Sequence, residues 1–500
     1  MKRITTLVLV AALTIGCAVS ARADGIDVKV QGQWDFVFGW TKNKPFKESY
    51  MRAALDGSKE KVRDNDNFIA RHRIRTQVNF ITSEYLQAVL LFEIGDIDWG
   101  RKGSGGALDT DGVNVETKRA YLDWIIPNTE ISVRMGLQGM SLPSALGSPV
   151  LEADVAGVSI ASPVTGWLDV NLFWVRPFDA DYNDGGGRDL SDEVDAFGIL
   201  LPVNFEGIRF TPWFMYGFIG ANSGFYDYLF HYEYENSVTD RARSKAWWLG
   251  AHLELSLWEP FVFNLEGVYG QINRADLSGL GHNAATGDPG LQKGPGQPSH
   301  IGSRGWYIGA TLDYTLDFMT PGIFGWYASG DDKDDYLDDG YLGRLPMLGI
   351  DGGSFCATSF GTANYYGIGN GDNWQTVMGT PAGTWGVGIQ LADISFIEDL
   401  SHTIRLAYYR GTNDSDLIKV VGGENAPRFQ SDALYLTDKD YVWEVNFDHT
   451  YDIYENLTMA VELGWLRLHS DKDTWKQAGM SGLKENDNAW KAEVNFRYSF

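Results

Sequence analysis

Cysteine is almost absent: the chain of 500 residues has two, at positions 17 and 356. The first lies in an N-terminal segment that we expect to be removed, which would leave Cys356 alone in the mature protein. A single cysteine cannot form an internal disulfide. A zinc site built from several cysteines is excluded for the same reason.

Basic residues and long apolar runs are also scarce. The chain has 41 Lys and Arg against 66 Asp and Glu, a formal net charge of −25. Binding to nucleic acid depends on clustered Lys and Arg, so we expect no nucleic-acid partner. After the N-terminal segment there is no apolar run long enough for a transmembrane helix. Aromatic residues make up 14% of the chain and there are 58 glycines, which suits strands and turns better than helices.

The N-terminal segment predicts export. "MKRITTLVLVAALTIGCAVSARA" has a basic start, an apolar stretch and an Ala-Arg-Ala ending at residue 23. This pattern predicts a signal peptide, residues 1–23, cleaved before Asp24. A membrane anchor fits less well because the apolar stretch is short, and the residues before Cys17 fit a lipidation site poorly. Cleavage would take the net charge to −28, because the segment carries three basic residues and no acid.

The remaining chain alternates apolar and polar residues in segments of about ten or more. Examples are "IDVKVQGQWDFVFGW" (26–40) and "WKAEVNFRYSF" (490–500). A period of two predicts strands with one apolar and one polar face. We predict 18 strands, with 16 as the alternative, near 26–40, 66–83, 85–95, 114–126, 129–139, 152–162, 166–176, 192–202, 206–219, 244–258, 261–272, 303–316, 321–330, 384–394, 401–411, 439–449, 455–468 and 488–500.

Connections of two lengths alternate between these strands. Two-residue turns such as 83–84 and 259–260 alternate with long segments such as 331–383. Short periplasmic turns and long extracellular loops are typical of outer-membrane β-barrels. A secreted β-sandwich would also alternate, but here aromatic residues lie at the ends of the apolar faces, as at a membrane interface. We therefore predict an all-β fold: one transmembrane antiparallel β-barrel domain over residues 24–500.

Several motifs resemble those of a known family. They are "RIRTQVNF" (73–80), "FEIGDIDWG" (92–100), "KRAYLDW" (118–124), "VRMGLQGMSLPSALGSPVLEADVAG" (133–157), "WYASGDD" (326–332) and "AYYRGTN" (407–413). With them the chain resembles bacterial outer-membrane homotrimeric porins of the Desulfovibrio type. The resemblance implies a homotrimer in the outer membrane in which each barrel has its own pore for small hydrophilic solutes.

Charged residues on the polar faces are candidates for the pore lining. Arg71, Arg73 and Arg75 occupy alternate positions of one predicted strand. Facing lipid, each would cost about 2–4 kcal/mol at the membrane midplane, so we expect them to face the lumen. The full set of predicted basic lining residues is Arg71, Arg73, Arg75, Arg119, Arg134 and Arg405, and the acidic ones are Glu93, Asp123, Glu152 and Asp154.

We expect the arginine row to face a row of carboxylates across the pore, so that a transverse field orders dipolar solutes. The alternative is an ordinary polar wall. If the arginine row sets the field, replacing its three arginines with serine should shift ion selectivity towards cations with little loss of stability.

Three loop segments have further candidate roles. Residues 140–153, "MSLPSALGSPVLEA", are the candidate constriction loop, on the strength of the resemblance. Acid-rich segments lie at 181–192 and 331–340, and Asp331, Asp332, Asp334 and Asp335 form a candidate calcium loop. Hard cations prefer several carboxylates. A solvated acidic surface that bridges to lipopolysaccharide through divalent ions is the alternative, and no other cofactor is expected.

Signatures of catalysis are missing, so we predict that the chain is not an enzyme. No serine lies in a G-x-S-x-G motif and the eight histidines show no H-x-x-x-H spacing. The prediction is a porin for passive diffusion of ions and small hydrophilic solutes. Alternatives are a substrate-specific channel for small organic anions, a barrel enzyme, and a plugged structural or adhesion barrel.

Overall fold

The computed structural model describes residues 25–43, 46, 67–109, 115–179, 193–220, 223, 243–276, 300–350, 355, 357–360, 380–421 and 435–500. The predicted signal peptide, the acid-rich segment 181–192 and both cysteines lie outside the described residues. Within the described ranges no helix is both long and apolar enough to cross a membrane.

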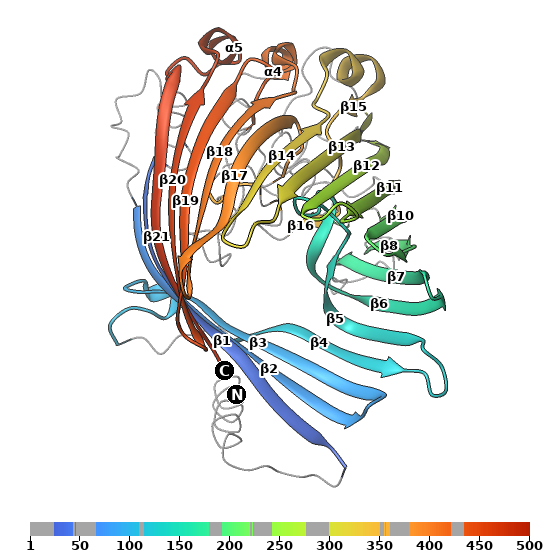
Figure 1. Cartoon of the computed structure of the whole chain (residues 1–500). Coiled ribbons are helices and arrows are strands. Elements are labelled where there is room, and N and C mark those ends of the chain that lie inside the picture. The colour runs from blue at the N-terminus through green and yellow to red at the C-terminus, as the bar shows by residue number, and fades with distance from the viewer. Residues whose placement is uncertain are drawn as a thin grey trace.

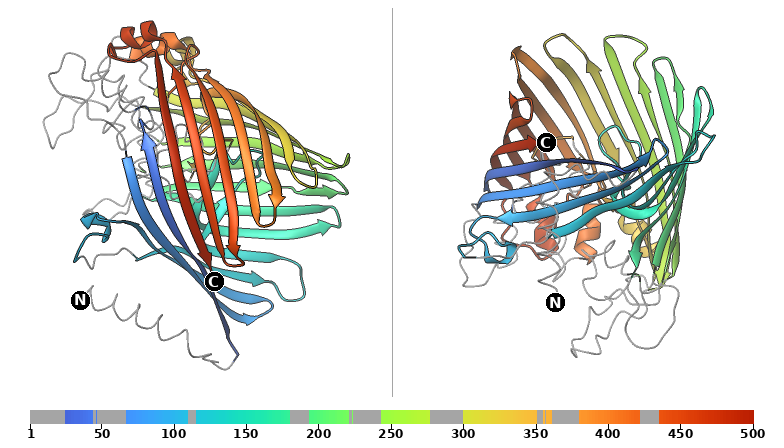
Figure 2. Two further views of the ribbon diagram at one scale, coloured as in Figure 1. Left: turned by 60° about the vertical axis from the view of Figure 1, so that its left-hand side comes forward. Right: turned by 90° about the horizontal axis from the view of Figure 1, so that it is seen from below.

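The wall of the molecule is a closed antiparallel β-barrel, as the sequence predicts. Among the described residues, 21 strands belong to one sheet, and 18 of them form the ring. The ring closes because the first strand pairs with both the second and the last (Figure 2). Neighbouring wall strands follow one another along the chain, so the barrel is a sequence of hairpins (Figure 1).

The bounds of the wall strands follow. They are β1 (Asp27–Lys42), β2 (Asn67–Ser83), β3 (Leu86–Asp98), β4 (Val115–Ile125), β5 (Ser132–Ser141), β6 (Leu151–Thr165), β7 (Leu168–Asp179), β8 (Glu193–Leu200), β10 (Ile208–Ile219), β11 (Ser244–Leu255), β12 (Phe261–Asp276), β13 (His300–Tyr314), β14 (Thr320–Ala328), β17 (Thr384–Ile397), β18 (Leu400–Gly411), β19 (Tyr441–Tyr454), β20 (Leu457–His469) and β21 (Asn486–Ser499).

Short elements lie between or beside the wall strands. The strand β9 (Val203–Phe205) follows β8 and pairs with β7 and β10, while β15 (Tyr341–Leu342) and β16 (Gly349–Ile350) pair in parallel with β13 and β6. The described helical turns are η1 (Lys102–Ser104), η2 (Asp335–Asp339), α4 (Ser415–Val421) and α5 (Lys472–Gln477). The turns α4 and α5 lie at the rim that carries the long loops (Figure 1).

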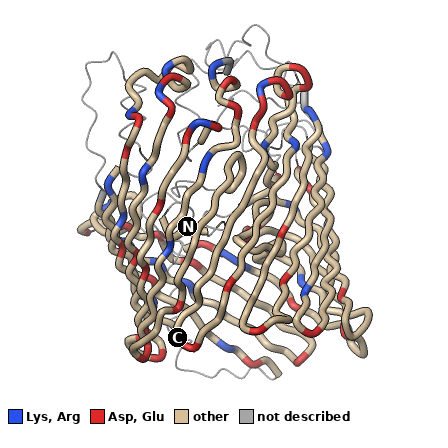
Figure 3. Tube along the Cα trace, turned by 45° about the horizontal axis from the view of Figure 1, so that its top comes forward, with Lys and Arg blue, Asp and Glu red and all other residues tan. Residues whose placement is uncertain are grey.

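The outer face of the wall is apolar and ends in aromatic rings. Trp34 and Trp40 on β1, Trp306 on β13 and Trp490 on β21 are all exposed, on the same parity as the apolar residues of their strands. Many strands also have long stretches without charged residues, and charged positions recur at both ends of the wall (Figure 3). This is the surface that a membrane-spanning barrel presents to lipid.

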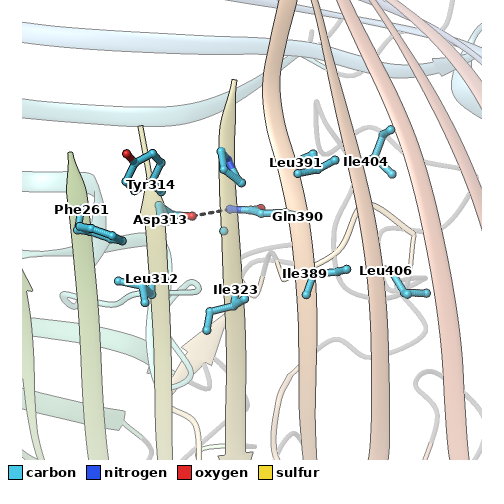
Figure 4. A pocket seen from close by; sticks show the side chains of 12 residues that line it. Phe261, Leu312, Asp313, Tyr314, Ile323, Ile389, Gln390, Leu391, Ile404 and Leu406 are labelled. Carbon is cyan, nitrogen blue, oxygen red and sulfur yellow. Dashed lines mark hydrogen bonds between the residues drawn. The ribbon is translucent and has the colours of Figure 1, made fainter. Parts of the chain in front are cut away.

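A shallow apolar groove crosses this outer face between β12 and β18. Leu312, Ile323 and Ile389 lie opposite one another in register and line it, and its volume is about 420 Å³ (Figure 4). On the alternate face Gln390 donates a hydrogen bond to Asp313, at 2.9 Å. The groove is therefore part of the apolar exterior, and the polar pair belongs to the inner face.

Candidate functional site

The arginine row of β2 faces the inside of the barrel. Arg71 and Arg73 are 5% and 6% exposed, whereas Phe68, on the opposite parity, is 54% exposed. The Nε of Arg71 donates to Oδ1 of Asp98 at 2.6 Å, and its Nη1 donates to Oδ2 of Asp96 at 3.2 Å. Both carboxylates come from the end of the neighbouring strand β3, so Arg71 is paired within the wall.

The rest of the row is surrounded in the same way. The Nε of Arg75 donates to Oε2 of Glu93 at 2.6 Å. Arg73 lies between the two, with nitrogens 3.9 Å from a Glu93 oxygen and 4.0 Å from an Asp35 oxygen. Asp35 also accepts a 2.6 Å hydrogen bond from Nε of Arg497, on the last strand.

The carboxylates therefore flank the arginines instead of facing them across the barrel. This corrects the expected geometry of opposed rows. Strand register explains this arrangement. The neighbouring strands β1 and β3 place inward carboxylates beside β2, and β21 places an inward guanidinium beside β1. Four guanidiniums and four carboxylates make a lattice of Arg71, Arg73, Arg75, Arg497, Asp35, Glu93, Asp96 and Asp98. At its edge Arg101 also pairs with Asp98, at 2.8 Å.

The predicted residues of β4 and β5 form a second set of pairs. Arg134 binds Asp123 through two hydrogen bonds, of 2.6 and 2.9 Å, and stacks over the ring of Tyr121 at 4.3 Å. Arg119 binds Asp154 at 2.6 Å. The side chains of Arg119 and Arg134 are 40% and 39% exposed, so this set is open to solvent where the β2 lattice is buried.

The remaining predicted residues lie apart from these two sets. Arg405 on β18 pairs with Asp448 at 3.0 Å, on the other side of the seam between β21 and β1. Glu152 lies near the start of β6 and accepts a hydrogen bond from the backbone N–H of Ser148, at 3.2 Å. The structure thus brings the row of β2 together with Glu93, and it places the other predicted residues in separate pairs.

The connection between β5 and β6 turns into the barrel. The wall strands end at Ser141 and resume at Leu151, so the connection is shorter than the predicted segment 140–153. The backbone N–H of Leu146 reaches Oε1 of Glu266 on β12, at 3.3 Å. Leu146 and Val150 are buried in the main apolar cluster, which also contains inner-face residues of β7 to β14. This segment therefore covers the inner face of distant strands.

The connection between β14 and β17 also enters the barrel, which the sequence analysis missed. Pro346 accepts a hydrogen bond from the indole of Trp248 on β11, at 2.8 Å. Leu348 donates to the carbonyl of Val150, at 2.8 Å, so the two inward segments touch each other. The sequence feature that could have indicated this burial is the apolar content of 341–360, "YLGRLPMLGIDGGSFCATSF", which is unusual for a loop in water.

Wall glycines fit this inward segment closely. A Cβ at Gly305 on β13 would collide with the backbone of Arg344 and Leu345. The absence of a side chain at this position lets the segment lie directly on the strand. Ser303, two residues earlier on the same face, donates to the carbonyl of Arg344 at 2.7 Å.

The end of the described segment, residues 357–360, docks on β19 to β21. Thr358 donates to Oε2 of Glu444 at 2.9 Å, and Ser359 donates to Oδ1 of Asp448 at 3.0 Å. The ammonium of Lys491 donates to the carbonyl of Ser359 at 2.5 Å and also binds Glu462. Buried carboxylates and one lysine therefore fasten the segment to the wall.

The acid-rich segment 331–340 is held by protein groups at described positions. Asp331 is 1% exposed and pairs with Arg344 at 2.7 Å. Asp332 accepts hydrogen bonds from the N–H groups of Asp334 and Asp335, at 2.8 and 3.0 Å. Among the described residues, no three His, Cys, Asp or Glu side chains are grouped to hold a metal ion. Asp331 thus takes part in an ion pair and Asp332 in a turn, and calcium binding by the four candidate residues stays a prediction.

The long-loop rim above β18 to β21 is tied together by Asp440. Its carboxylate accepts hydrogen bonds from Oγ1 of Thr437 at 2.6 Å, from the indole of Trp475 at 3.1 Å and from the N–H of Asp471 at 2.8 Å. Burial raises the pKa of Asp440, and these donors pull it in the opposite direction. The two neighbouring loops are thereby joined at one buried carboxylate.

Known proteins give a limited comparison. The chain matches no family model and no curated protein. It is similar to solved structures of Acinetobacter baumannii OccAB3 (10% identity, 94% of this chain, 100% of that chain, TM-score 0.49) and Pseudomonas aeruginosa OccK8 (11%, 95%, 98%, 0.49). It is also similar to the outer membrane protein OprD from Pseudomonas aeruginosa (10%, 94%, 94%, 0.46). At these identities and scores the likenesses add nothing to the barrel that the strand register itself defines.

Proposed function

We propose that the protein is a bacterial outer-membrane channel for the passive diffusion of ions and small hydrophilic solutes. The observation that supports it most is the contrast between the two faces of the closed barrel. The outer face is apolar with aromatic ends, and the inner face of β1 to β5 carries charged pairs. Charged side chains are inexpensive on an inner wall in contact with water and costly towards lipid.

We extend the proposal to selectivity for small organic anions, the alternative from the sequence. Two inward segments cover much of the wall, which leaves the charged strands as the polar surface for solutes. Arg119 and Arg134 are paired with Asp154 and Asp123 but are still 40% and 39% exposed there, so their remaining N–H groups can donate to a solute carboxylate. We further propose that the protein is exported and forms a homotrimer in which each barrel has its own pore. Residues 142–150 and 341–349 would form the constriction of that pore.

Conductance of the purified protein in planar lipid bilayers tests the channel. We expect stepwise openings, and addition of a small dicarboxylate should block the current in a concentration-dependent way. Absence of any conductance would contradict the channel and favour a plugged structural barrel. Conductance without block would leave a general porin and remove the anion selectivity. Crosslinking in membranes checks the trimer.

A further inference from the structure

The outer face of β18 to β20 carries two arginines near the long-loop rim. In register, Arg410 lies opposite Tyr441, and Trp443 lies opposite Arg467. Their neighbours along the strands, such as Tyr409 and Leu466, are buried on the inner face. Because side chains alternate along a strand, Arg410 and Arg467 are on the outer face.

Aromatic rings surround both arginines. Tyr408 and Trp443 have ring centroids 4.9 Å apart, and Tyr441 stacks on His469 at 4.6 Å. One register step further from the rim the outer face is apolar, and Trp465 there is 39% exposed. We call Arg410, Arg467, Tyr441, Trp443 and His469 the arginine–aromatic patch. Aromatic rings of this kind lie where acyl chains meet head groups.

The two guanidiniums of the patch have no carboxylate partner at the described positions. Arg467 is exposed and makes no ion pair with any described residue. Arg410 donates through Nε to a backbone carbonyl, that of Asp438, at 2.6 Å, and makes no ion pair with a described carboxylate. The patch therefore has two net positive charges on a face that otherwise suits lipid.

Arg176 on β7 provides the contrast. It also lies on the outer face near the long-loop rim, because its partner Asp195 alternates with the buried Val194 and Ala196. Its guanidinium lies 2.9 Å from an Asp195 oxygen and 3.7 Å from a Glu193 oxygen. On the outer face, Arg176 is thus neutralised by carboxylates, whereas Arg410 and Arg467 have no described carboxylate partner.

We propose that the arginine–aromatic patch binds the phosphorylated head group of lipid A, the membrane anchor of lipopolysaccharide. The inference rests on the proposed outer-membrane location, which puts the long-loop rim in the outer leaflet. Arg410 and Arg467 are two strands apart, about 10 Å at the usual strand spacing. Each can hold one phosphate of a head group that carries two, through charge-assisted hydrogen bonds. The aromatic rings pack against the sugars and the first carbons of the acyl chains.

Native mass spectrometry of the detergent-purified protein with added lipid A tests the patch. We expect Arg467→Gln to weaken lipid A binding by about ten-fold, the usual loss for one charge-assisted hydrogen bond, and the Arg410→Gln/Arg467→Gln pair to weaken it further. Arg176→Gln is the matched control and should bind as the wild type does. Since Arg467 makes no ion pair with described residues, its replacement should leave folding intact, which heat-modifiable migration in gels verifies.

Several outcomes would overturn the proposal. Unchanged lipid A binding in the double variant would do so, as would an equal loss in Arg176→Gln. Phosphatidylglycerol that binds as tightly as lipid A would mean that one phosphate suffices. A changed oligomeric state in Arg467→Gln, with lipid binding unchanged, would assign the patch to a second copy of the chain.

Conductance of the same variants separates the two proposals, because we expect it to stay at the wild-type value. A barrel that binds lipid A but never conducts would refute only the channel.

Discussion

Two stretches of the inner wall differ sharply. The charged arc, which we define as the inner-facing residues of β1 to β5, is a set of paired arginines and carboxylates. The apolar arc, the inner-facing residues of β7 to β14, contains buried residues such as Val175, Trp248, Tyr307 and Trp326. The outer faces of both arcs carry exposed apolar side chains, such as Trp34 on β1 and Phe214 on β10. One barrel wall therefore has one kind of exterior and two kinds of interior.

The difference divides the inner wall between strands that pack against inward segments and strands that, in the proposed channel, contact solutes. Inward segments need apolar strands on which to bury their leucines, and they lie over the apolar arc. The charged arc compensates its own charges through strand register, so it needs no such cover. Four changes to the chain would break or sharpen this division.

The largest effect is expected from Arg71→Ser/Arg73→Ser/Arg75→Ser in the charged arc. It would remove three positive charges from the lattice around β2, leave Asp96 without Arg71 and Arg73, and leave Asp98 with Arg101 only. Breaking a buried ion pair costs on the order of 3–5 kcal/mol, so the melting temperature should fall. The reversal potential should shift towards cations. This replaces the expectation, drawn from the sequence, of little loss of stability.

Neutralising the lattice from both sides is the control for that variant. Adding Glu93→Gln, Asp96→Asn and Asp98→Asn to the triple change should restore charge balance and part of the stability. A reversal potential that stays constant in the triple variant would place the row outside the path of the current.

Gly305→Ala attacks the apolar arc. The added methyl group would collide with the backbone of Arg344 and Leu345, so we expect the inward segment to leave β13. Overpacking of this kind costs about 1–3 kcal/mol, and single-channel conductance should rise. Gly267→Ala is the matched control, because the nearest atom to its new Cβ, the carbonyl oxygen of Tyr307, is 4.0 Å away. Equal conductance in both variants would argue against a covering role for the segment.

Glu444→Ala, at the far end of the same segment, should have a similar effect on stability but a smaller one on conductance. It removes the acceptor of Thr358 and leaves the hydroxyl of Tyr409, now 3.1 Å from Glu444, without a partner. The loss should be about 1–3 kcal/mol, with more frequent current fluctuations. Tyr409→Phe removes a donor to Glu444 but leaves the contact between Thr358 and Glu444 in place. The frequency of its current fluctuations should therefore stay at the wild-type value. A noisy Tyr409→Phe channel would count against docking as the cause.

The smallest effect is expected from Arg134→Gln. Its pair with Asp123 is partly exposed, and such pairs contribute at most about 1 kcal/mol. The melting temperature should hardly change, while the reversal potential should move slightly towards cations. A loss of stability as large as that of the β2 triple variant would erase the difference between buried and open pairs within the charged arc.

The wall could be read from the sequence because alternation is a local property. All 18 predicted strands are present, and the aromatic rings at their apolar ends, such as Trp34 and Trp490, point outward. The row on β2 was found for the same reason. Its partners Asp96 and Asp98 were not, since pairing across strands depends on register and on irregularities near His72 and Ile94.

The apolar arc escaped prediction because alternation disappears where both faces of a strand are apolar. On β11, Trp247 points outward and Trp248 is fully buried inside, and the pattern alone cannot tell which residue belongs to which face. The loop between β14 and β17 was classed as extracellular by its length. The leucines of this loop indicate that part of it is buried. The sequence does not show which strands they pack against, because those strands are distant in the chain.

The pairing of Asp35 with Arg497 joins residues that are 462 positions apart in the chain. Closing so long a loop has a high entropic cost and depends on the last strand having been made. Until then Asp35 has Arg73 of β2 at 4.0 Å but lacks its shorter contact with Arg497, and an open sheet presents β1 at an edge. The seam therefore makes one ion pair of the lattice depend on complete assembly: a chain without its last strand would leave β1 unpaired and Asp35 without Arg497 at the edge that must close.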